Sequence, residues 1–303
     1  NAPTASIADA VRGIASAVTA TNSKINLYYN TIYLNATSSG TNFGTSGVFH
    51  TVSTVATTGT LDMANNIIIN ESTANGGGFT AGLRRSGAAL TNFATISNRN
   101  LLYAGVPSAN NTIYYNGTTG YSTMLDYQGA VLPREVNSLT GEMGFITGGY
   151  ATPNNFFISL TPSSADFLRP LNGIATAVES GGVSITSPAI SLDYADAIRQ
   201  GSTGYTGTGS APDIGAYEFE GLSAIPEINF ISSTPDFTTQ CVSTPRVISV
   251  EILPTAGTTL GATIVYSVNG VPQTNVVMVN VSGNIWEGTI PAVTPGNANV
   301  NWV

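Results

Sequence analysis

Met63-Ala64-Asn65-Asn66-Ile67-Ile68-Ile69-Asn70 is one of three copies of a phrase in which asparagine precedes residues that favour β-strands. The other two copies read Tyr28-Tyr29-Asn30-Thr31-Ile32-Tyr33-Leu34-Asn35 and Asn98-Arg99-Asn100-Leu101-Leu102-Tyr103. Aligning Ile32, Ile67 and Leu101 gives spacings of 35 and 34 residues, 67 − 32 and 101 − 67. A repeat of this length marks stacked units, each too small to bury its own apolar face. The repeat therefore predicts a solenoid.

The recurring asparagines have two physical uses in such a stack. Asparagine tolerates the left-handed backbone angles of a tight corner. Its side-chain amide also both donates and accepts hydrogen bonds, so an amide in one coil can bond to an amide in the next. We expect Asn30, Asn65, Asn66 and Asn100 to form a structural ladder of this kind.

The composition narrows the class of protein. Charged residues make up 9% of the 303 residues, against about 25% in a typical soluble domain, and Lys24 is the only lysine. The apolar content of 42% excludes a disordered chain. The net charge of −8 argues against binding nucleic acid, which needs clustered lysine and arginine. No apolar run approaches the length of about 20 residues that a membrane helix needs, so we expect no membrane insertion.

Short candidate strands, separated by clusters of Gly, Asn, Ser and Thr, continue to about residue 220. Segments 8–18 and 125–136 are the helix candidates, and the first fits a coil of the solenoid equally well. Strands without intervening helices also fit an antiparallel sandwich. The repeated asparagine phrase favours a parallel β-helix, and we expect it to close at Ala211-Pro212-Asp213-Ile214-Gly215-Ala216-Tyr217-Glu218-Phe219.

The remainder of the chain has a different pattern. Strands alternate apolar and polar residues at 246–252 and 263–268, and Asn269-Gly270 is a strong hairpin signal. The turn spacing is typical of a β-sandwich. Cys241 is the single cysteine, so it is either a free thiol or pairs with a cysteine outside this sequence. The chain begins and ends on segments that read as the middle of a domain, and we expect it to be a fragment.

The three asparagine phrases and the closing Pro212-Asp213-Ile214-Gly215-Ala216-Tyr217-Glu218-Phe219 resemble the right-handed parallel β-helix regions of large secreted surface proteins of gliding and related bacteria. Such proteins are typically exported by the type nine secretion system, through a sorting domain that this chain does not include. The resemblance covers residues 1 to about 220, and the rest resembles an immunoglobulin-like module of the same chains. It implies an extracellular or cell-surface location and, most often, no enzymatic activity.

We therefore expect an all-β protein, with a right-handed parallel β-helix over residues 1–222 and an immunoglobulin-like β-sandwich over residues 223–303. We expect a non-enzymatic, adhesin-like protein whose partners are glycans or other surface proteins. A passive spacer without a ligand is a further hypothesis.

The same β-helix fold also carries polysaccharide lyases and glycoside hydrolases, which is the alternative function. A lyase would need several acids around Ca²⁺ and a nearby base, and a hydrolase two facing carboxylates. The acids are thinly spread, although a pairing of Asp62 with Asp126 or Glu71 stays open. Asp193 and Asp196 either cap a turn or bind a cation, and we expect capping. We predict no catalytic residue and no cofactor, with Ca²⁺ as the open alternative.

Two pairs of residues are candidates for ligand binding. Arg84 and Arg85 form the only basic doublet, and adjacent strand residues face opposite ways. Tyr114 and Tyr115 belong to a tyrosine-rich third of the chain, and tyrosine offers both a stacking face and a polar tip. The sole histidine, His50, lies in a strand without a nucleophile motif, and one histidine with one cysteine does not suggest a zinc site.

Overall fold

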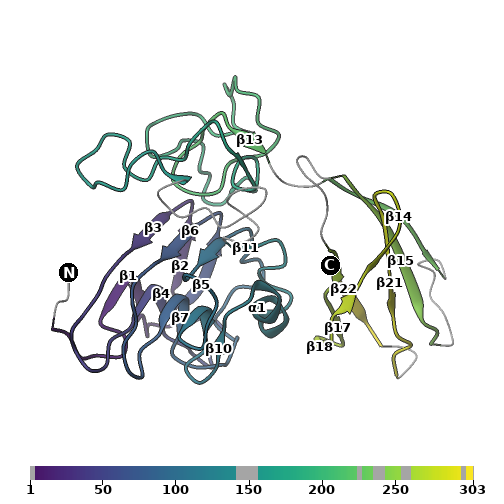
Figure 1. The fold of residues 1–303 in the computed structure, drawn as a ribbon, viewed down its shortest axis with the longest axis horizontal. Helices are drawn as coiled ribbons and strands as arrows, with labels where there is room; N and C mark the ends of the chain where they lie inside the picture. The colour runs from purple at the N-terminus through teal and green to yellow at the C-terminus, as the bar shows by residue number, and fades with distance from the viewer. Residues whose placement is uncertain are drawn as a thin grey trace.

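The computed structural model describes residues 4–140, 156–223, 227–234, 243–253, 261–294 and 298–302. The described chain is nearly all β and contains a β-solenoid of about four turns, consistent with a parallel β-helix. Figure 1 shows its coils succeeding one another from the purple N-terminal strands to the teal helix α1 (Met124–Val131). Cys241 lies outside the described residues.

Three sheets form the walls of the solenoid. The front sheet has the spatial order β1 (Val11–Ser16), β4 (Thr45–His50), β7 (Thr80–Arg85), β9 (Asn111–Tyr115) and β10 (Gly120–Tyr121). The covered sheet has the order β3 (Thr31–Leu34), β6 (Ile67–Asn70), β8 (Leu101–Tyr103) and β11 (Leu139–Thr140). A two-stranded sheet pairs β2 (Lys24–Tyr28) with β5 (Thr60–Ala64). All of these neighbours pair in parallel except β9 and β10.

The observed register corrects one alignment made from the sequence. Thr31, not Ile32, pairs with Ile67, so the first coil here spans 36 residues, 67 − 31. The second step, from Ile67 to Leu101, is 34 residues, as the repeat predicts. The shift matters because a one-residue slip moves a side chain to the other face of a strand. Ile32 pairs with Ile68 and both face the interior, whereas Ile67 faces outward.

The interior core lies between the three sheets. It is lined by fully buried aliphatic side chains such as Val48, Leu61, Ile68 and Leu102. Helix α1 covers the end of this core beside β9, because Met124, Tyr127 and Val131 lie on one helical face and are buried in the same cluster. Thr123 caps the helix by accepting a hydrogen bond from the Asp126 amide at 3.2 Å.

Gly47 allows the front sheet to approach the covered sheet closely. A Cβ at this position would lie 2.3 Å from Cγ2 of Ile68 and 2.8 Å from the carbonyl oxygen of Gly82. Neither distance is compatible with a side chain, and the cores of proteins are too well packed to move far. Because residue 47 is a glycine, the backbone of β4 can lie close to the side chain of Ile68 on β6.

An asparagine ladder runs along one corner of the solenoid. The side-chain amide of Asn30 donates to Oδ1 of Asn66 at 2.8 Å, and that of Asn66 donates to Oδ1 of Asn100 at 2.8 Å. The backbone amides of Asn30 and Asn66 bond to the same oxygens, each at 3.0 Å. The ladder ends where Asn100 donates to the buried carboxylate of Glu135 at 3.0 Å. Asn65 does not belong to the ladder, since its side chain bonds to Val183.

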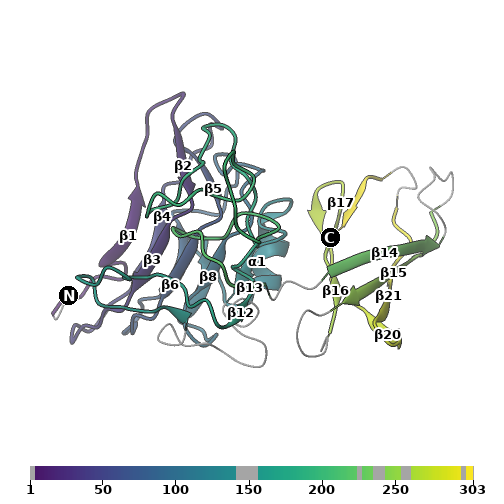
Figure 2. The same ribbon diagram turned by 90° about the horizontal axis from the view of Figure 1, so that it is seen from above.

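Residues 156–223, which we call the cover segment, lie against the outer face of the covered sheet and do not stack as further coils. Ile67, Ile69, Leu101 and Tyr103 of that face pack against residues of the cover segment, including Phe156, Phe157, Leu168, Val178, Ile214 and Phe219. Figure 2 shows the cover segment lying across β3, β6 and β8. Within it, β12 (Ala175–Thr176) pairs in parallel with β13 (Leu222–Ser223).

The remaining strands pair with one another. One sheet has the order β14 (Glu227–Thr234), β15 (Arg246–Leu253), β21 (Ile285–Ile290) and β20 (Val279–Ser282). The others pair β16 (Thr263–Ile264) with β19 (Val276–Val277), and β17 (Tyr266–Val268) with β18 (Val271–Pro272) and β22 (Val300–Trp302). All of these pairs are antiparallel, and they share a core that includes Ile248, Tyr266 and Trp286. Across the part of the chain that the structure describes, no helix has the length and apolar character needed to cross a bilayer.

Candidate functional site

The outer face of the front sheet carries a row of side chains that we call the Arg–aromatic row: Arg12, Phe49, Arg84 and Tyr115. Phe49 pairs in register with Arg84, and Arg84 with Tyr115, so the three lie side by side on successive coils. Their neighbours Val48, Leu83 and Tyr114 face the interior core. Strand alternation therefore directs the row outward.

Each arginine of the row lies over an aromatic ring. The guanidinium carbon of Arg12 is 3.7 Å from the centroid of the Phe49 ring, and that of Arg84 is 4.9 Å from the centroid of Tyr115. These distances are in the range of cation–π attraction. The ring of Phe79 stacks on Tyr115 with centroids 4.5 Å apart. Cations and aromatic rings thus alternate along the row.

Asp9 connects the two arginines of the row. Its Oδ2 lies 2.7 Å from Nε of Arg12 and 3.7 Å from Nε of Arg84, and Ser46 donates to its Oδ1 at 2.7 Å. The side chains of Arg12 and Arg84 are 36% and 18% exposed. The terminal nitrogens of Arg12 make no hydrogen bond within the described residues, and Arg84 uses Nη1 to bond to the carbonyl of Ala8 at 3.3 Å. Two cations against one carboxylate leave a local positive charge on the row.

The structure separates the four residues predicted for ligand binding into two environments. Arg84 and Tyr115 belong to the outward row, whereas Arg85 and Tyr114 are buried in the interior, with 0% and 1% of their surface exposed. A ligand on the surface does not reach Arg85 or Tyr114 in this structure. The alternation of the strand places the two members of each pair on opposite faces.

Arg85 is held by an interior polar network. Its guanidinium donates to Nδ1 of His50 at 3.2 Å, to the carbonyl of Ala89 at 2.6 Å and to Oδ1 of Asn92 at 2.8 Å. Nε2 of His50 lies 2.8 Å from the carbonyl oxygen of Gly59, so it is the protonated nitrogen of a neutral ring. Burial lowers the pKa of His50 to about 4. His50 therefore joins coils together and is not placed as a catalytic base.

A second feature joins the solenoid to the cover segment. Tyr29, Asn65 and Arg99 occupy equivalent corners of three coils, and each has left-handed backbone angles, with φ of 56°, 58° and 57°. All three side chains reach the cover segment: Tyr29 and Asn65 donate to the carbonyl of Val183 at 2.8 and 2.7 Å, and Arg99 donates to that of Gly181 at 3.0 Å. Of these three residue types, asparagine adopts this backbone most readily. Tyr29 and Arg99 hold these angles at positions where their side chains bond to the cover segment.

The closing phrase that begins at Pro212 is part of this docking. The amide of Gly215, at φ 97°, donates to the carbonyl of Asn65 at 2.7 Å, and a Cβ there would lie 2.5 Å from Cδ1 of Ile67. Glycine is required on both grounds. The carboxylate of Asp213 accepts from the amides of Ser180 and Phe219, each at 2.7 Å. The phrase therefore has a structural role against β6.

The buried acids of the cover segment also bind backbone groups. Burial, together with Glu179, raises the pKa of Asp213 to about 8. Glu218 pairs with the buried Arg199 at 3.3 Å and accepts from the amide of Gln200 at 2.9 Å. Asp193 accepts from the amides of Ala195 and Ala197 at 2.7 and 2.8 Å, which is a turn cap. Among the residues that the structure describes, no group of three or more Asp, Glu, His or Cys side chains is arranged to hold a metal ion.

The acids considered for catalysis interact with different partners. Asp62 is buried on β5 and lies 2.7 Å from both Nζ of Lys24 and the hydroxyl of Tyr28. Glu71 accepts from Tyr33 at 3.1 Å, and Asp126 from Thr123 at 2.6 Å. No residue bonds to two of these three carboxylates in the described parts of the chain.

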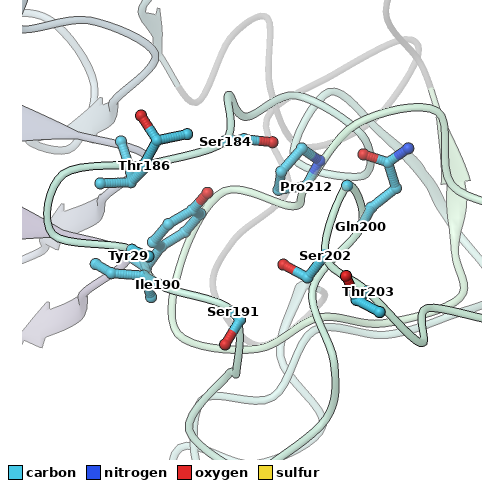
Figure 3. A pocket seen from close by; sticks show the side chains of 12 residues that line it. Tyr29, Ser184, Thr186, Ile190, Ser191, Gln200, Ser202, Thr203 and Pro212 are labelled. Atoms are coloured by element: carbon cyan, nitrogen blue, oxygen red, sulfur yellow. The ribbon is translucent and has the colours of Figure 1, made fainter.

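The cover segment, together with Tyr29, lines an open pocket, shown in Figure 3. We call it the polar groove; it has a volume of about 440 Å³ and is lined by Tyr29, Ser184, Ile185, Thr186, Ala189, Ile190, Ser191, Gln200, Gly201, Ser202, Thr203 and Pro212. None of these residues was singled out from the sequence as a ligand contact, because loop residues from segments 184–191 and 200–203 carry no spacing signal.

Comparison with protein-family models, with curated proteins and with solved structures finds no match to this chain. Its functional interpretation therefore rests on its own sequence and geometry.

Proposed function

We propose that this chain belongs to a non-enzymatic, extracellular surface protein that binds glycans through the Arg–aromatic row. The observation that carries the proposal is the in-register alignment of Phe49, Arg84 and Tyr115 on successive coils, with Arg12 beside Phe49. A linear polymer lying along the solenoid would meet a new contact on each coil. The proposal includes adhesin-like attachment and export by the type nine secretion system, which the sequence resemblance supports.

The charge of the row favours an acidic glycan. Guanidinium groups bind carboxylates with paired hydrogen bonds, and the side chains of Arg12 and Arg84 are 36% and 18% exposed beside aromatic rings. Both aromatic rings are already covered by arginine on one side. The guanidinium groups of the row are therefore better suited to bind carboxylates than its aromatic rings are to stack against sugars.

The proposal also treats residues 223–303 as an immunoglobulin-like β-sandwich. Antiparallel pairing in the order β14, β15, β21 and β20, with Trp286 in the core, supports it. An experimental structure of the chain would test this by its strand order.

The binding test uses calorimetric titration with oligomers of galacturonic acid. We expect saturable binding that Arg84→Ala weakens at least tenfold, since a charge-assisted hydrogen bond contributes about 1.5–3 kcal/mol and tenfold corresponds to about 1.4 kcal/mol. Arg169→Ala is the matched control. Arg169 also lies over a tyrosine, at 6.0 Å from Tyr217, and beside an aspartate, at 3.4 Å from Asp166, but it belongs to the cover segment.

Two results would overturn the proposal. Equal affinity of Arg84→Ala and the unchanged protein would exclude the row as the binding surface. Release of unsaturated sugar products from uronic-acid polymers with Ca²⁺ present, lost in Arg84→Ala, would establish the lyase alternative.

A further inference from the structure

The polar groove lies between the first coil of the solenoid and the cover segment. Tyr29, which follows β2, contributes an aromatic wall, and loops 184–191 and 200–203 contribute the rest together with Pro212. In Figure 3, Tyr29 and Ile190 lie on one side of the groove, and Gln200, Ser202 and Thr203 on the other. Its volume of about 440 Å³ is in the range of small-molecule sites, about 300–1,000 Å³.

The lining of the polar groove combines apolar surface with uncharged donors and acceptors. The apolar part comes from Tyr29, Ile185, Ala189, Ile190 and Pro212. The polar side chains are those of Ser184, Thr186, Ser191, Gln200, Ser202 and Thr203. None of these six side chains makes a hydrogen bond to another described residue, so their hydroxyl and amide groups are available to a ligand.

The polar groove offers no counter-charge to an ionic ligand. No Asp, Glu, Lys, Arg or His is among the residues that line it. Arg199 lies behind Tyr29, but it is 2% exposed and already bonds to Glu218 and to the carbonyls of Gly215 and Ala216. Since a charged ligand would lose hydration without gaining a partner, the groove selects against it.

Tyr29 and the backbone around the polar groove are held in place before any ligand binds. The guanidinium carbon of Arg199 lies 3.9 Å from the ring centroid of Tyr29, and the Tyr29 hydroxyl is bonded to Val183. The side chain of Asn65 holds Val183 by two hydrogen bonds: it accepts from the Val183 backbone amide at 3.0 Å and donates to the Val183 carbonyl at 2.7 Å. The backbone amide of Gln200 donates a hydrogen bond to the carboxylate of Glu218. Such preorganisation reduces the entropy lost on binding.

We propose that the polar groove binds a neutral saccharide unit, with the C–H face of the ring on Ile190 and on the small exposed part of Tyr29, which is 6% exposed, and with its hydroxyls bonded to the six polar side chains. A sugar ring combines an apolar face with a rim of uncharged hydroxyls, which matches this lining. The site is separate from the Arg–aromatic row and takes the opposite class of glycan, uncharged and not acidic.

The test is saturation-transfer difference NMR with the whole chain, using glucose, galactose, mannose and N-acetylglucosamine, their β-linked disaccharides, and galacturonic acid. We expect saturable binding of at least one neutral sugar and none of galacturonic acid in the polar groove. The triple variant Gln200→Ala/Ser202→Ala/Thr203→Ala should weaken binding at least tenfold. A second variant, Ser191→Trp, should abolish it by filling the groove.

Gln273→Ala/Thr95→Ala is the control, because Gln273 and Thr95 are exposed polar residues outside the groove, and their loss should leave affinity unchanged. Arg84→Ala should also leave neutral-sugar binding unchanged, which separates this site from the row. Absence of binding by every neutral sugar would overturn the proposal. Undiminished affinity in both groove variants, or galacturonic acid binding that they remove, would overturn it as well.

Discussion

Replacing Asn66 by alanine removes the middle step of the asparagine ladder. The side chain is buried, accepts from the backbone and side-chain amides of Asn30, and donates to Leu27, Ala64 and Asn100 at 2.7, 3.1 and 2.8 Å. Each hydrogen bond contributes about 0.5–1.5 kcal/mol net, and a buried group left without a partner costs about 1–3 kcal/mol. Allowing for shared donors, we expect Asn66→Ala to lower the free energy of unfolding by about 3–5 kcal/mol.

Asn30→Ala is the matched comparison at the end of the same ladder. Asn30 is half-buried, and its side chain makes two hydrogen bonds, to Tyr28 at 3.2 Å and to Asn66 at 2.8 Å. We expect a loss of about 1–2 kcal/mol. The assay is urea unfolding monitored by circular dichroism. Trp286 and Trp302, the only tryptophans, lie within residues 227–302, so their emission serves as an internal control. A loss below about 1 kcal/mol for Asn66→Ala, or one no larger than for Asn30→Ala, would refute the ladder's role in stability.

Three further predictions follow from packing, burial and charge. Gly47→Ala should destabilise the chain by about 1–3 kcal/mol in the same urea assay, because the added Cβ would collide with Ile68. Gly129→Ala in α1, where a Cβ would meet no atom within 4 Å, should stabilise it by about 0.5–1 kcal/mol. A loss of stability at both positions would contradict the close approach of the two sheets at Gly47. Arg85→Lys should destabilise the chain by about 2–4 kcal/mol, since three hydrogen bonds of the buried guanidinium are lost or distorted. Arg84→Lys should change stability by less than about 1 kcal/mol, and equal effects of the two substitutions in thermal unfolding would be inconsistent with the two environments. Burial raises the pKa of Glu135 to about 7, so the folded state holds a proton that the unfolded state releases above about pH 4.3. The contribution of Glu135 to stability therefore falls as the pH rises towards 7, and Glu135→Gln should lose less stability than the unchanged protein between pH 5 and 8 in the same urea assay.

The asparagine phrase was sufficient to predict stacked β-coils, because a period of about 35 residues with inward aliphatics leaves few other ways to bury them. It was not sufficient to place the first coil to the residue. Three consecutive isoleucines, Ile67 to Ile69, offer alternative apolar alignments, and the choice is made by the asparagine ladder and by the left-handed corners at Tyr29 and Asn65.

The cover segment could not be predicted from the repeat. The outward positions Ile67, Ile69 and Leu101 are as apolar as the inward positions, so both faces of β6 and β8 are buried. A strand buried on both faces reads as a continuous apolar run, and Ile67-Ile68-Ile69 is such a run. It was the available signal that a second layer covers the sheet.

The candidate site was predicted in part. Alternation correctly implied that Arg84 and Arg85 face opposite ways, but it did not say which one is outward. That depends on the inward apolar positions of β4 and β7, and on the interior hydrogen bonds that His50 and Asn92 supply to Arg85. The polar groove depends on where two loops of the cover segment come together, and loop positions of that kind leave no periodic trace in a sequence.

The most direct test of the proposed function is a titration of the arginine Nε–Hε NMR signals with an oligomer of galacturonic acid. The chain has eight arginines, the nine basic residues less Lys24. We predict that the signals of Arg12 and Arg84 shift and saturate together, while those of Arg85, Arg99, Arg134, Arg169, Arg199 and Arg246 stay in place. Shifts confined to other arginines, or none at any oligomer concentration, would contradict glycan binding by the Arg–aromatic row.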